Sequence, residues 1–253
     1  MRFAHLASGS RGNALVVSHG ATHVLVDCGL SLRRVTRRLG ELGLAPEALA
    51  AILVTHEHGD HASGVRRLAE AHGIPVLASA GTARAADLED LLAGEPLQAE
   101  RPFAVGALEI HPYTVPHDAR EPLQFVFGDG RHRLGVLTDC GHPTPHVQAA
   151  LDGCQALVLE CNHDPGALAR GDYPPAVKAR VGGDWGHLSN PQAAALLARL
   201  DTGALRHVVA AHLSERHNTP QQARQALSAP LDCPPEEIHV ACQEAGTPWL
   251  DLN

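Results

Sequence analysis

The sequence predicts an α/β fold in which two β-sheets lie face to face between two layers of helices, a four-layer αββα sandwich. Three features support this prediction. Short β-like runs separated by turn residues open the chain, strand–helix alternation follows, and the second half repeats the same order. Because no linker or low-complexity stretch divides the halves of the 253-residue chain, we expect one domain over residues 1–253.

The first half begins with three predicted strands, and the turn 19–22 joins the last two as a hairpin. The helix that follows carries Leu32, Val35 and Leu39 on one stripe, which is amphipathic spacing. A short β-branched run then leads into a His-rich loop. The predicted strands are 3–7, 14–18, 23–27, 51–55 and 75–78, and the predicted helices are 31–42, 65–72 and 81–92.

The second half has the same order of strands followed by helices. Its clearest helix start is Ser189-Asn190-Pro191, where a capping residue precedes a proline of the first turn. The predicted strands are 108–114, 124–128, 133–138, 156–160, 207–211 and 237–241, and the predicted helices are 191–200 and 219–227.

Composition narrows the class of protein. The formal charge of −8 argues against non-specific coating of nucleic acid, but it allows a local basic groove or an acidic pocket filled by cations. The six cysteines form no CxxC pair, which favours a reduced protein. The sequence shows no apolar signal region and no run long enough to span a membrane, so we expect a cytoplasmic protein. Histidine is unusually frequent, at 18 residues.

The strongest motif is Thr55-His56-Glu57-His58-Gly59-Asp60-His61, directly after a predicted strand. Residues two apart in extended chain point the same way, so His56 and His58 can bind one ion. Asp60 and His61 follow Gly59, where a turn can bring them to a second ion. This mixture of nitrogen and carboxylate ligands suits zinc, manganese or iron better than calcium. An exposed His-rich loop is the less favoured interpretation.

Two metal sites need ligands from elsewhere in the chain. Candidates follow three later strands: His117, with His111 as a competitor, then Asp139, then His212. Functional groups commonly lie beyond strand ends in α/β sheets. A strand-end Asp is also a common helix cap, and a strand-end His often makes only a surface hydrogen bond, so each candidate alone stays open.

Together these motifs resemble the metallo-β-lactamase superfamily over the whole chain. Within it, the order of motifs resembles the YycJ (WalJ) branch of metal-dependent nucleases, related more distantly to ribonuclease Z and the phosphodiesterase PhnP. The motifs are SGSRGN, LVDCGLS, ILVTHEHGDH, PHDAREP, LTDCG, LVLECNHD, GHLSN and AHLSERHN. The resemblance implies two divalent metal ions, zinc or manganese with iron as a third option. It assigns one ion to His56, His58 and His117, the other to Asp60, His61 and His212, and Asp139 as a bridge.

By the ribonuclease Z pattern, Glu160 pairs with His187, and His187 protonates the leaving oxygen. A carboxylate beside an imidazole raises its pKa, which suits a general acid. The alternative for His187 is a helix-entry residue, and His163 is a competing candidate. The chain departs from relatives in carrying Cys140 after the bridging Asp139, a side chain that need not bind metal. It also lacks the long arm of ribonuclease Z and the inserted domain of β-CASP nucleases.

The function expected from this resemblance is hydrolysis of a phosphodiester by a metal-bridging hydroxide, with Asp60 orienting the hydroxide. A 5′-to-3′ exonuclease acting on DNA is favoured. The alternatives are a small-molecule hydrolase, either a cyclic phosphodiesterase or a glyoxalase-II-like thioesterase, and a non-catalytic metal-binding module. Arg11 in its Gly-rich loop can bind a second phosphate or belong to an ordinary turn. The arginines at 33, 34, 37 and 38 can face DNA, but a solvated helix face is favoured.

Overall fold

The computed structural model describes residues 1–252, and two β-sheets packed face to face form its centre. The first sheet has the order β13-β1-β2-β3-β4-β5. Its strands are antiparallel up to the β2–β3 hairpin, and β3, β4 and β5 are parallel. The strands are β1 (Arg2–Ala7), β2 (Ala14–His19), β3 (Thr22–Val26), β4 (Leu49–Leu53), β5 (Val76–Leu77) and β13 (Leu250–Asp251).

The second sheet has the order β12-β11-β10-β9-β8-β7-β6. Its first four strands in that order are parallel, and β8 runs antiparallel to both of its neighbours. The strands are β6 (Phe103–Val105), β7 (Leu108–Thr114), β8 (Leu123–Gly128), β9 (Arg133–Leu137), β10 (Ala156–Glu160), β11 (His207–Ala211) and β12 (His239–Val240).

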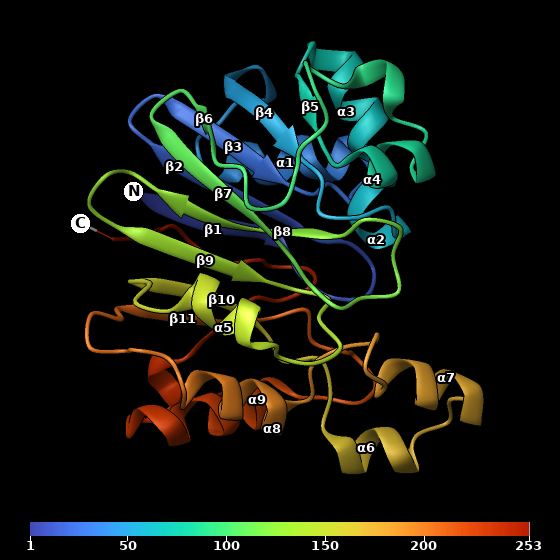
Figure 1. Ribbon diagram of the computed structural model, residues 1–253, viewed down its shortest axis with the longest axis vertical. Helices are drawn as coiled ribbons and strands as arrows, with labels where there is room; N and C mark the ends of the chain where they lie inside the picture. The colour runs from blue at the N-terminus through green and yellow to red at the C-terminus, as the bar shows by residue number, and fades with distance from the viewer. Residues whose placement is uncertain (253) are drawn as a thin grey trace.

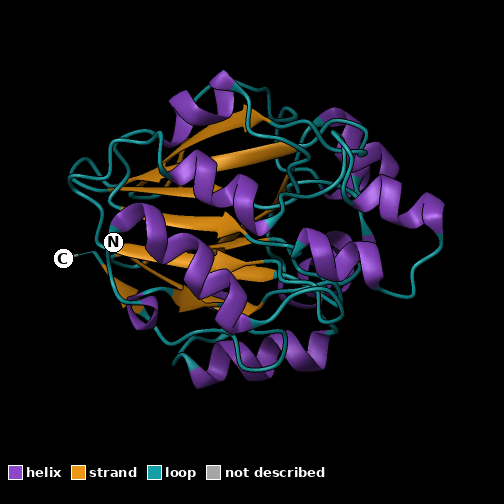
Figure 2. Ribbon diagram, turned by 90° about the horizontal axis from the view of Figure 1, so that it is seen from below, coloured by secondary structure: helices purple, strands orange, loops and turns teal. Residues whose placement is uncertain are grey.

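Helices cover the outer face of each sheet, so the chain has the predicted four layers (Figures 1 and 2). In Figure 1, α3 and α4 lie at the upper right of the sheets, and α8 and α9 lie below them. The helices are α1 (Leu32–Glu41), α2 (Gly59–Ala62), α3 (Val65–His72), α4 (Ala80–Ala85), α5 (Pro145–Leu151), α6 (Pro165–Arg170), α7 (Pro175–Val181), α8 (Asn190–Leu197) and α9 (Pro220–Ser228).

Three apolar layers hold these elements together. The central layer lies between the sheets and includes Phe3, Phe125 and Phe127, which are fully buried. A second layer packs α1 and α3 on the first sheet, and Val35 and Leu39 of the predicted stripe belong to it. The third layer packs α5, α8 and α9 on the second sheet. Burial of apolar surface on both faces of each sheet provides the main stabilisation of the fold.

The predicted strands and helices are present, with most ends shifted by a few residues. The helix predicted at 81–92 is wrong in extent: α4 ends at Ala85, because Asp87 adopts a left-handed backbone (φ 56°), and a separate 3₁₀ turn follows at Glu89–Leu91. The sequence reading missed β6, β13 and the helices α2, α5, α6 and α7. Both α5 and α6 begin with a capping side chain followed by proline, a signal that predicts a helix start.

The parallel strands of both sheets end at the same edge of the sandwich. The loops after β3, β4, β7, β9, β10 and β11 therefore meet there, and they carry the predicted site residues. Within residues 1–252, no helix is both long enough and apolar enough to cross a bilayer.

Candidate metal centre and active site

Three residues at this edge have a strained backbone that aims their side chains into the site. Asp27, Asp139 and His212 follow β3, β9 and β11, and their φ angles are 60°, 53° and 54°. Left-handed backbone costs a non-glycine residue free energy, of order 1–3 kcal/mol, and persists where the surrounding structure requires it. The strand ends therefore turn sharply, as a cluster of convergent side chains needs.

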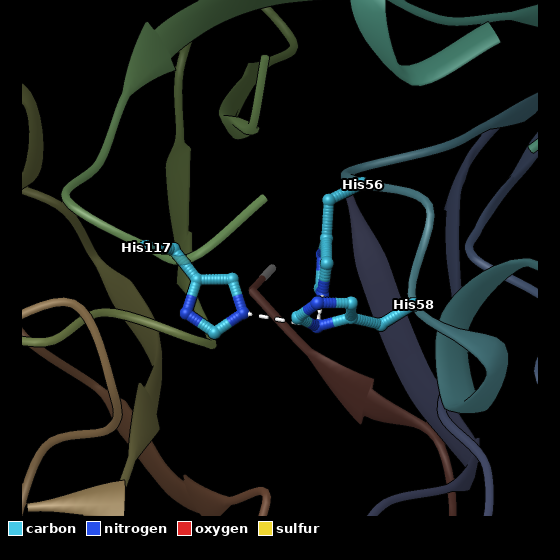
Figure 3. Close-up of side chains that lie close together, drawn as sticks. All are labelled: His56, His58 and His117. Atoms are coloured by element: carbon cyan, nitrogen blue, oxygen red, sulfur yellow. Dashed lines mark hydrogen bonds between the residues drawn. The ribbon is translucent and has the colours of Figure 1, made fainter. Parts of the chain in front are cut away.

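The first group of candidate ligands is His56, His58 and His117. His56 Nε2 lies 3.1 Å from His58 Nδ1, which lies 3.2 Å from His117 Nε2. Figure 3 shows His117 approaching from a separate loop, opposite the two histidines of the β4–α2 loop. Burial lowers the pKa of both His56 and His117, which keeps these imidazoles neutral as metal ligands require. Thr55 Oγ1 and the Gly186 carbonyl contact their outer nitrogens, at 2.9 and 3.1 Å.

The second group of candidate ligands is Asp60, His61 and His212. Asp60 Oδ2 lies 3.4 Å from His61 Nε2 and 3.2 Å from His212 Nε2. Asp60 and His61 belong to the short helix α2, the turn that leads from the β4 loop into α3. His212 comes from the other half of the chain, so this group forms only when the two sheets pack together.

Asp139 lies between the two groups. Its Oδ2 is 3.0 Å from His61 Nε2, and its Oδ1 is 3.9 Å from His117 Nε2. The side chain is buried, and apart from this contact with the His61 ring, Asp139 Oδ2 has no hydrogen-bond partner among the described residues. A buried carboxylate oxygen with so few partners is costly unless something else, such as a cation, compensates it.

The spacing of these atoms fits metal coordination. Two nitrogens bound to one tetrahedral zinc ion lie about 3.3 Å apart, given bonds of about 2.0–2.1 Å. The distances of 3.1 and 3.2 Å in the first group agree with that spacing. Each group offers three ligand atoms, and Asp139 can add a fourth to both. The residues present therefore fit divalent metal ions.

The electrostatics of the second group also favour cations. Burial would raise the pKa of Asp139, but His212 and His61 hold it well below its usual range. Hydrogen bonds from the same two histidines outweigh burial and lower the pKa of Asp60. In turn, despite burial, Asp139 and Asp27 raise the pKa of His61, and Asp139 and Asp60 raise that of His212 to about 10. Protons on these histidines balance the carboxylates in the metal-free chain, and bound cations would displace them.

Glu160 accepts hydrogen bonds from several residues beside the second group of candidate ligands. Its Oε1 accepts hydrogen bonds from Nδ1 of His187 at 2.9 Å and from Nδ1 of His212 at 3.0 Å. Its Oε2 accepts the backbone N–H groups of Cys140 and Leu188. The predicted Glu160–His187 pair is present, and the link from Glu160 to His212 is an addition of the structure. Burial raises the pKa of Glu160, but His187 outweighs this effect and lowers it to about 2, so Glu160 is ionised.

Asp27 is the site residue that sequence reasoning missed. It is buried, and its Oδ2 accepts hydrogen bonds from His61 Nδ1 at 2.7 Å and from Thr55 Oγ1 at 2.8 Å. Its Oδ1 accepts the Thr55 backbone N–H at 2.8 Å. An acidic residue directly after the apolar run 24–26 was the available signal, because a buried carboxylate needs partners.

The Gly-rich loop at residues 8–13 supports the metal-binding loop rather than a second phosphate. Arg11 binds Glu215 and Glu244, so its guanidinium is paired within the chain. Asn13 Nδ2 lies 3.2 Å from Asp60 Oδ2. The loop that follows β3 also needs glycine: a Cβ on Gly29 would lie 1.8 Å from the Asp60 carbonyl oxygen.

The arginine stripe of α1 is divided between two environments. Arg34 and Arg38 donate to the carbonyl groups of Gln243 and Ala245, near the C-terminus. Arg33 and Arg37 are exposed. Half of the stripe therefore binds the chain itself, and the solvated-face interpretation describes the rest.

A cleft of about 350 Å³ opens over both groups of candidate ligands. Asp60, Asp139, His187 and His212 line it, together with residues from α7 and the loop before it. The two competing histidines lie elsewhere. The His111 side chain is 46% exposed on β7 beside Glu109, and His163 is buried and, within residues 1–252, belongs to none of the groups of candidate ligands.

Comparison with known proteins agrees with this geometry. Residues 22–213 match the family model described as "Beta-lactamase superfamily domain". The chain is 35% identical over 238 residues to the exodeoxyribonuclease YycJ of Bacillus anthracis, covering 92% of this chain and 89% of that one. It is 31% identical over 232 residues to the exodeoxyribonuclease WalJ of Streptococcus pneumoniae strain D39, with coverages of 89% and 86%.

Among solved structures, the metallo-β-lactamase fold protein YhfI of Bacillus subtilis superposes with a TM-score of 0.76 at 16% identity, covering 99% of both chains. A likeness at this identity shows the fold. Two packed sheets between helices, a metal-binding geometry at their common edge and the family match all agree. The chain therefore belongs to the beta-lactamase superfamily, and it is a hydrolase with the metallo-β-lactamase fold.

Proposed function

We propose that the chain is a binuclear metal-dependent phosphodiesterase, and specifically a 5′-to-3′ exonuclease acting on DNA. One observation carries the phosphodiester assignment: His187, hydrogen-bonded to Glu160, lines the same cleft as candidate ligands of both groups. The similarity to two exodeoxyribonucleases over most of the chain supports DNA as the substrate. The 5′-to-3′ direction rests on the family resemblance.

In this proposal His56, His58 and His117 hold one divalent ion, and Asp60, His61 and His212 hold the second. Asp139 contacts both, as its place between the groups suggests. Bound divalent ions would act as Lewis acids on the phosphate oxygens and lower the pKa of the attacking water toward neutrality. Zinc, manganese and iron all suit this ligand set.

The protein's own groups complete the reaction at both ends of the scissile bond. Asp60 would accept a hydrogen bond from the attacking water and so orient it. His187 donates its Nδ1–H to Glu160, which leaves Nε2 to protonate the departing sugar oxygen. Although burial disfavours the charged ring, Glu160 and Asp139 raise the pKa of His187, which favours the acid form.

The presence of this general acid favours a phosphodiester over a thioester as the substrate. A sugar alkoxide is strongly basic and needs a proton as it leaves, whereas a thiolate leaves with little help. A side chain positioned in the cleft as a general acid is therefore expected in a phosphodiesterase and is unnecessary in a glyoxalase-II-like thioesterase.

The test compares three substrates after chelation and reconstitution with Mn²⁺ or Zn²⁺. These are single- and double-stranded oligodeoxynucleotides labelled at either end, bis-p-nitrophenyl phosphate, and a thioester. We expect stepwise shortening of DNA from the 5′ end, dependent on added metal and lost in Asp60→Ala.

Three results would contradict the proposal. Hydrolysis of the small ester with no cleavage of any DNA would make the chain a small-molecule phosphodiesterase. Preference for the thioester, unaffected by His187→Ala, would make it a thioesterase. Full nuclease activity in Asp60→Ala would contradict the assignment of Asp60 to the metal site.

A further inference from the structure

A small cavity, which we call the inner cavity, lies between the two sheets near the edge that carries the candidate ligands. Its volume is about 20 Å³, and every residue that lines it is buried. One part of the lining is apolar and belongs to the central core layer: Leu15, Val26, Val136 and Val158. The other part is polar: His5, Ser8, Asn13, Asp27 and Thr138. A polar cavity of this size can hold one water molecule, which needs roughly 10–15 Å³ and two to four polar partners.

His5 is the one buried ring of this cavity, and the proposed reaction does not use it. It interrupts the apolar run of β1 and pairs with Leu15 of β2. Paired residues of antiparallel strands point to the same side of the sheet, so the ring points into the central layer as Leu15 does. Burial lowers the pKa of His5 to about 3, which keeps the ring neutral. Its Nδ1 is buried and has no hydrogen-bond partner within residues 1–252, which is costly in a protein interior.

Two hydroxyl groups of the inner cavity also have unused hydrogen-bonding capacity. Ser8 Oγ accepts the His212 backbone N–H at 2.8 Å, and Thr138 Oγ1 accepts from Gln124 Nε2 at 3.3 Å. Neither hydroxyl donates its own proton to a group in the described part of the chain, although each can donate one hydrogen bond. With His5 Nδ1, the cavity therefore offers three free partners to a water molecule.

The other polar residues of the inner cavity are each tied to a different candidate ligand. The pairs, which are in contact or adjacent in the chain, are Ser8 with His212, Thr138 with Asp139, Asp27 with His61 and Asn13 with Asp60. These ligands are the whole second group and the residue between the groups. Asp27, Asp139 and His212 have the left-handed backbone described above, which persists only where surrounding contacts require it.

We propose that the inner cavity binds one water molecule, which joins His5 Nδ1 to the hydroxyls of Ser8 and Thr138. A water molecule suits either form of the neutral ring, because it donates to an unprotonated Nδ1 and accepts from a protonated one. It links β1 to the strand ends that carry Asp139 and His212. His5 is thereby a positioning residue for the second group of candidate ligands. Its effect on metal affinity rests on the proposed binuclear site, whereas the water molecule itself does not require metal.

A high-resolution crystal structure of the metal-loaded enzyme tests the water directly. We expect one ordered water molecule between the sheets, within about 2.7–3.2 Å of His5 Nδ1 and of at least one of the two hydroxyls. The structure of His5→Leu should lack it, because leucine fills a similar space and offers no polar atom. No electron density in the inner cavity of the unmutated enzyme would overturn the inference.

Metal affinity, measured by chelator competition, tests the positioning role. His5→Leu should weaken metal binding by about 2- to 10-fold, the effect of one lost hydrogen bond. Thr138→Val, which removes a hydroxyl and keeps the branched shape, should cause a similar loss. Because both variants act through one water molecule, the double variant should lose less than the product of the two factors. His5→Gln should recover part of the affinity, because its amide can still bind water.

Phe3→Leu is the matched control, since Phe3 lies two residues earlier on β1 in the same core layer. It should lower the melting temperature and leave metal affinity unchanged.

Three further outcomes would overturn the inference. Unchanged metal affinity in His5→Leu, with a raised melting temperature, would show that Nδ1 is simply unpaired. Equal losses of affinity in His5→Leu and Phe3→Leu would make His5 an ordinary core residue. Losses that multiply in the double variant would exclude a shared water molecule. Absence of metal binding by the unmutated enzyme would instead contradict the proposed function, whatever the inner cavity holds.

Discussion

Asp27 Oδ2 accepts a hydrogen bond from Nδ1 of His61 at 2.7 Å, and both side chains are buried. A histidine that donates through Nδ1 presents an unprotonated Nε2 to a metal ion. Asp27 comes from the loop after β3 and His61 from α2, so this contact also ties the metal-binding loop to the neighbouring strand of the first sheet. The contact therefore decides both the tautomer and the position of a candidate ligand.

Asp27→Asn should weaken metal binding without unfolding the chain. The amide cannot accept from His61 as a carboxylate does, and loss of such supporting contacts typically costs about 10–100-fold in metal affinity. Chelator competition measures the affinity, with circular dichroism as the check on folding. Thr55→Ser is the matched control, because it keeps the hydroxyl that donates to Asp27. Unchanged affinity in Asp27→Asn would show that His61 is positioned by other contacts.

Asp139→Asn should remove metal from both groups. The side chain keeps its size, but one oxygen becomes an amide nitrogen that cannot bind a cation. Elemental analysis of purified protein should show a fall from about two ions per chain, the number expected for a binuclear hydrolase, to one or none. His111→Ala, an exposed histidine away from the cleft, is the control. Full occupancy in Asp139→Asn would contradict the bridging role.

His187→Ala should reduce cleavage of DNA by about 10²- to 10⁴-fold, the usual contribution of a general acid. Cleavage of bis-p-nitrophenyl phosphate should fall much less, because p-nitrophenolate leaves without a proton. Since the pKa of His187 is raised, the rate on DNA should fall only as pH rises through that raised value. The variant should lose this alkaline limb. Equal losses on both substrates would show that His187 does not act as the acid.

Glu160→Gln should affect both histidines that it contacts. An amide oxygen can still accept one hydrogen bond, but it lacks the charge that favours the protonated form of His187. We therefore expect the acid defect of His187→Ala together with weaker metal binding through His212. Combined pH profiles and metal titrations distinguish the two variants. Unchanged metal affinity in Glu160→Gln would show that Glu160 supports only the general acid His187 and not metal binding through His212.

Without bound metal, the stability of the fold should decrease as the pH rises above neutrality. Despite burial, Asp139 and Asp60 raise the pKa of His212 to about 10 in the metal-free chain, from a usual 6.5. The stabilisation is complete below the unfolded value and is lost as pH rises through about 10. The melting temperature of chelated protein should therefore fall from neutral pH toward pH 10. The melting temperature of metal-loaded protein should fall less, because cations replace the protons. Parallel curves of melting temperature against pH for the two forms would contradict this account.

The sequence alone determined the order of most strands, the helices α1, α3, α8 and α9, and the metal-binding motif. These features depend on local patterns: alternation and helical stripes depend on side-chain period, and the cluster from His56 to His61 lies within six residues. His117, Asp139 and His212 were recognisable because each follows an apolar strand. The family comparisons agree with the fold and the family that these motifs predicted.

Contacts between distant segments were decided only by the tertiary structure. Asp27 looked like an ordinary strand-end residue, and its role became clear when β3 and β4 paired beside α2. Glu160 was expected to support one histidine and supports two, because β10 lies next to β11. From the sequence, Arg11 could bind a phosphate or belong to an ordinary turn, whereas the structure pairs it with two distant glutamates. Sequence patterns encode burial and local geometry, whereas the partner of a polar side chain depends on which elements pack beside it.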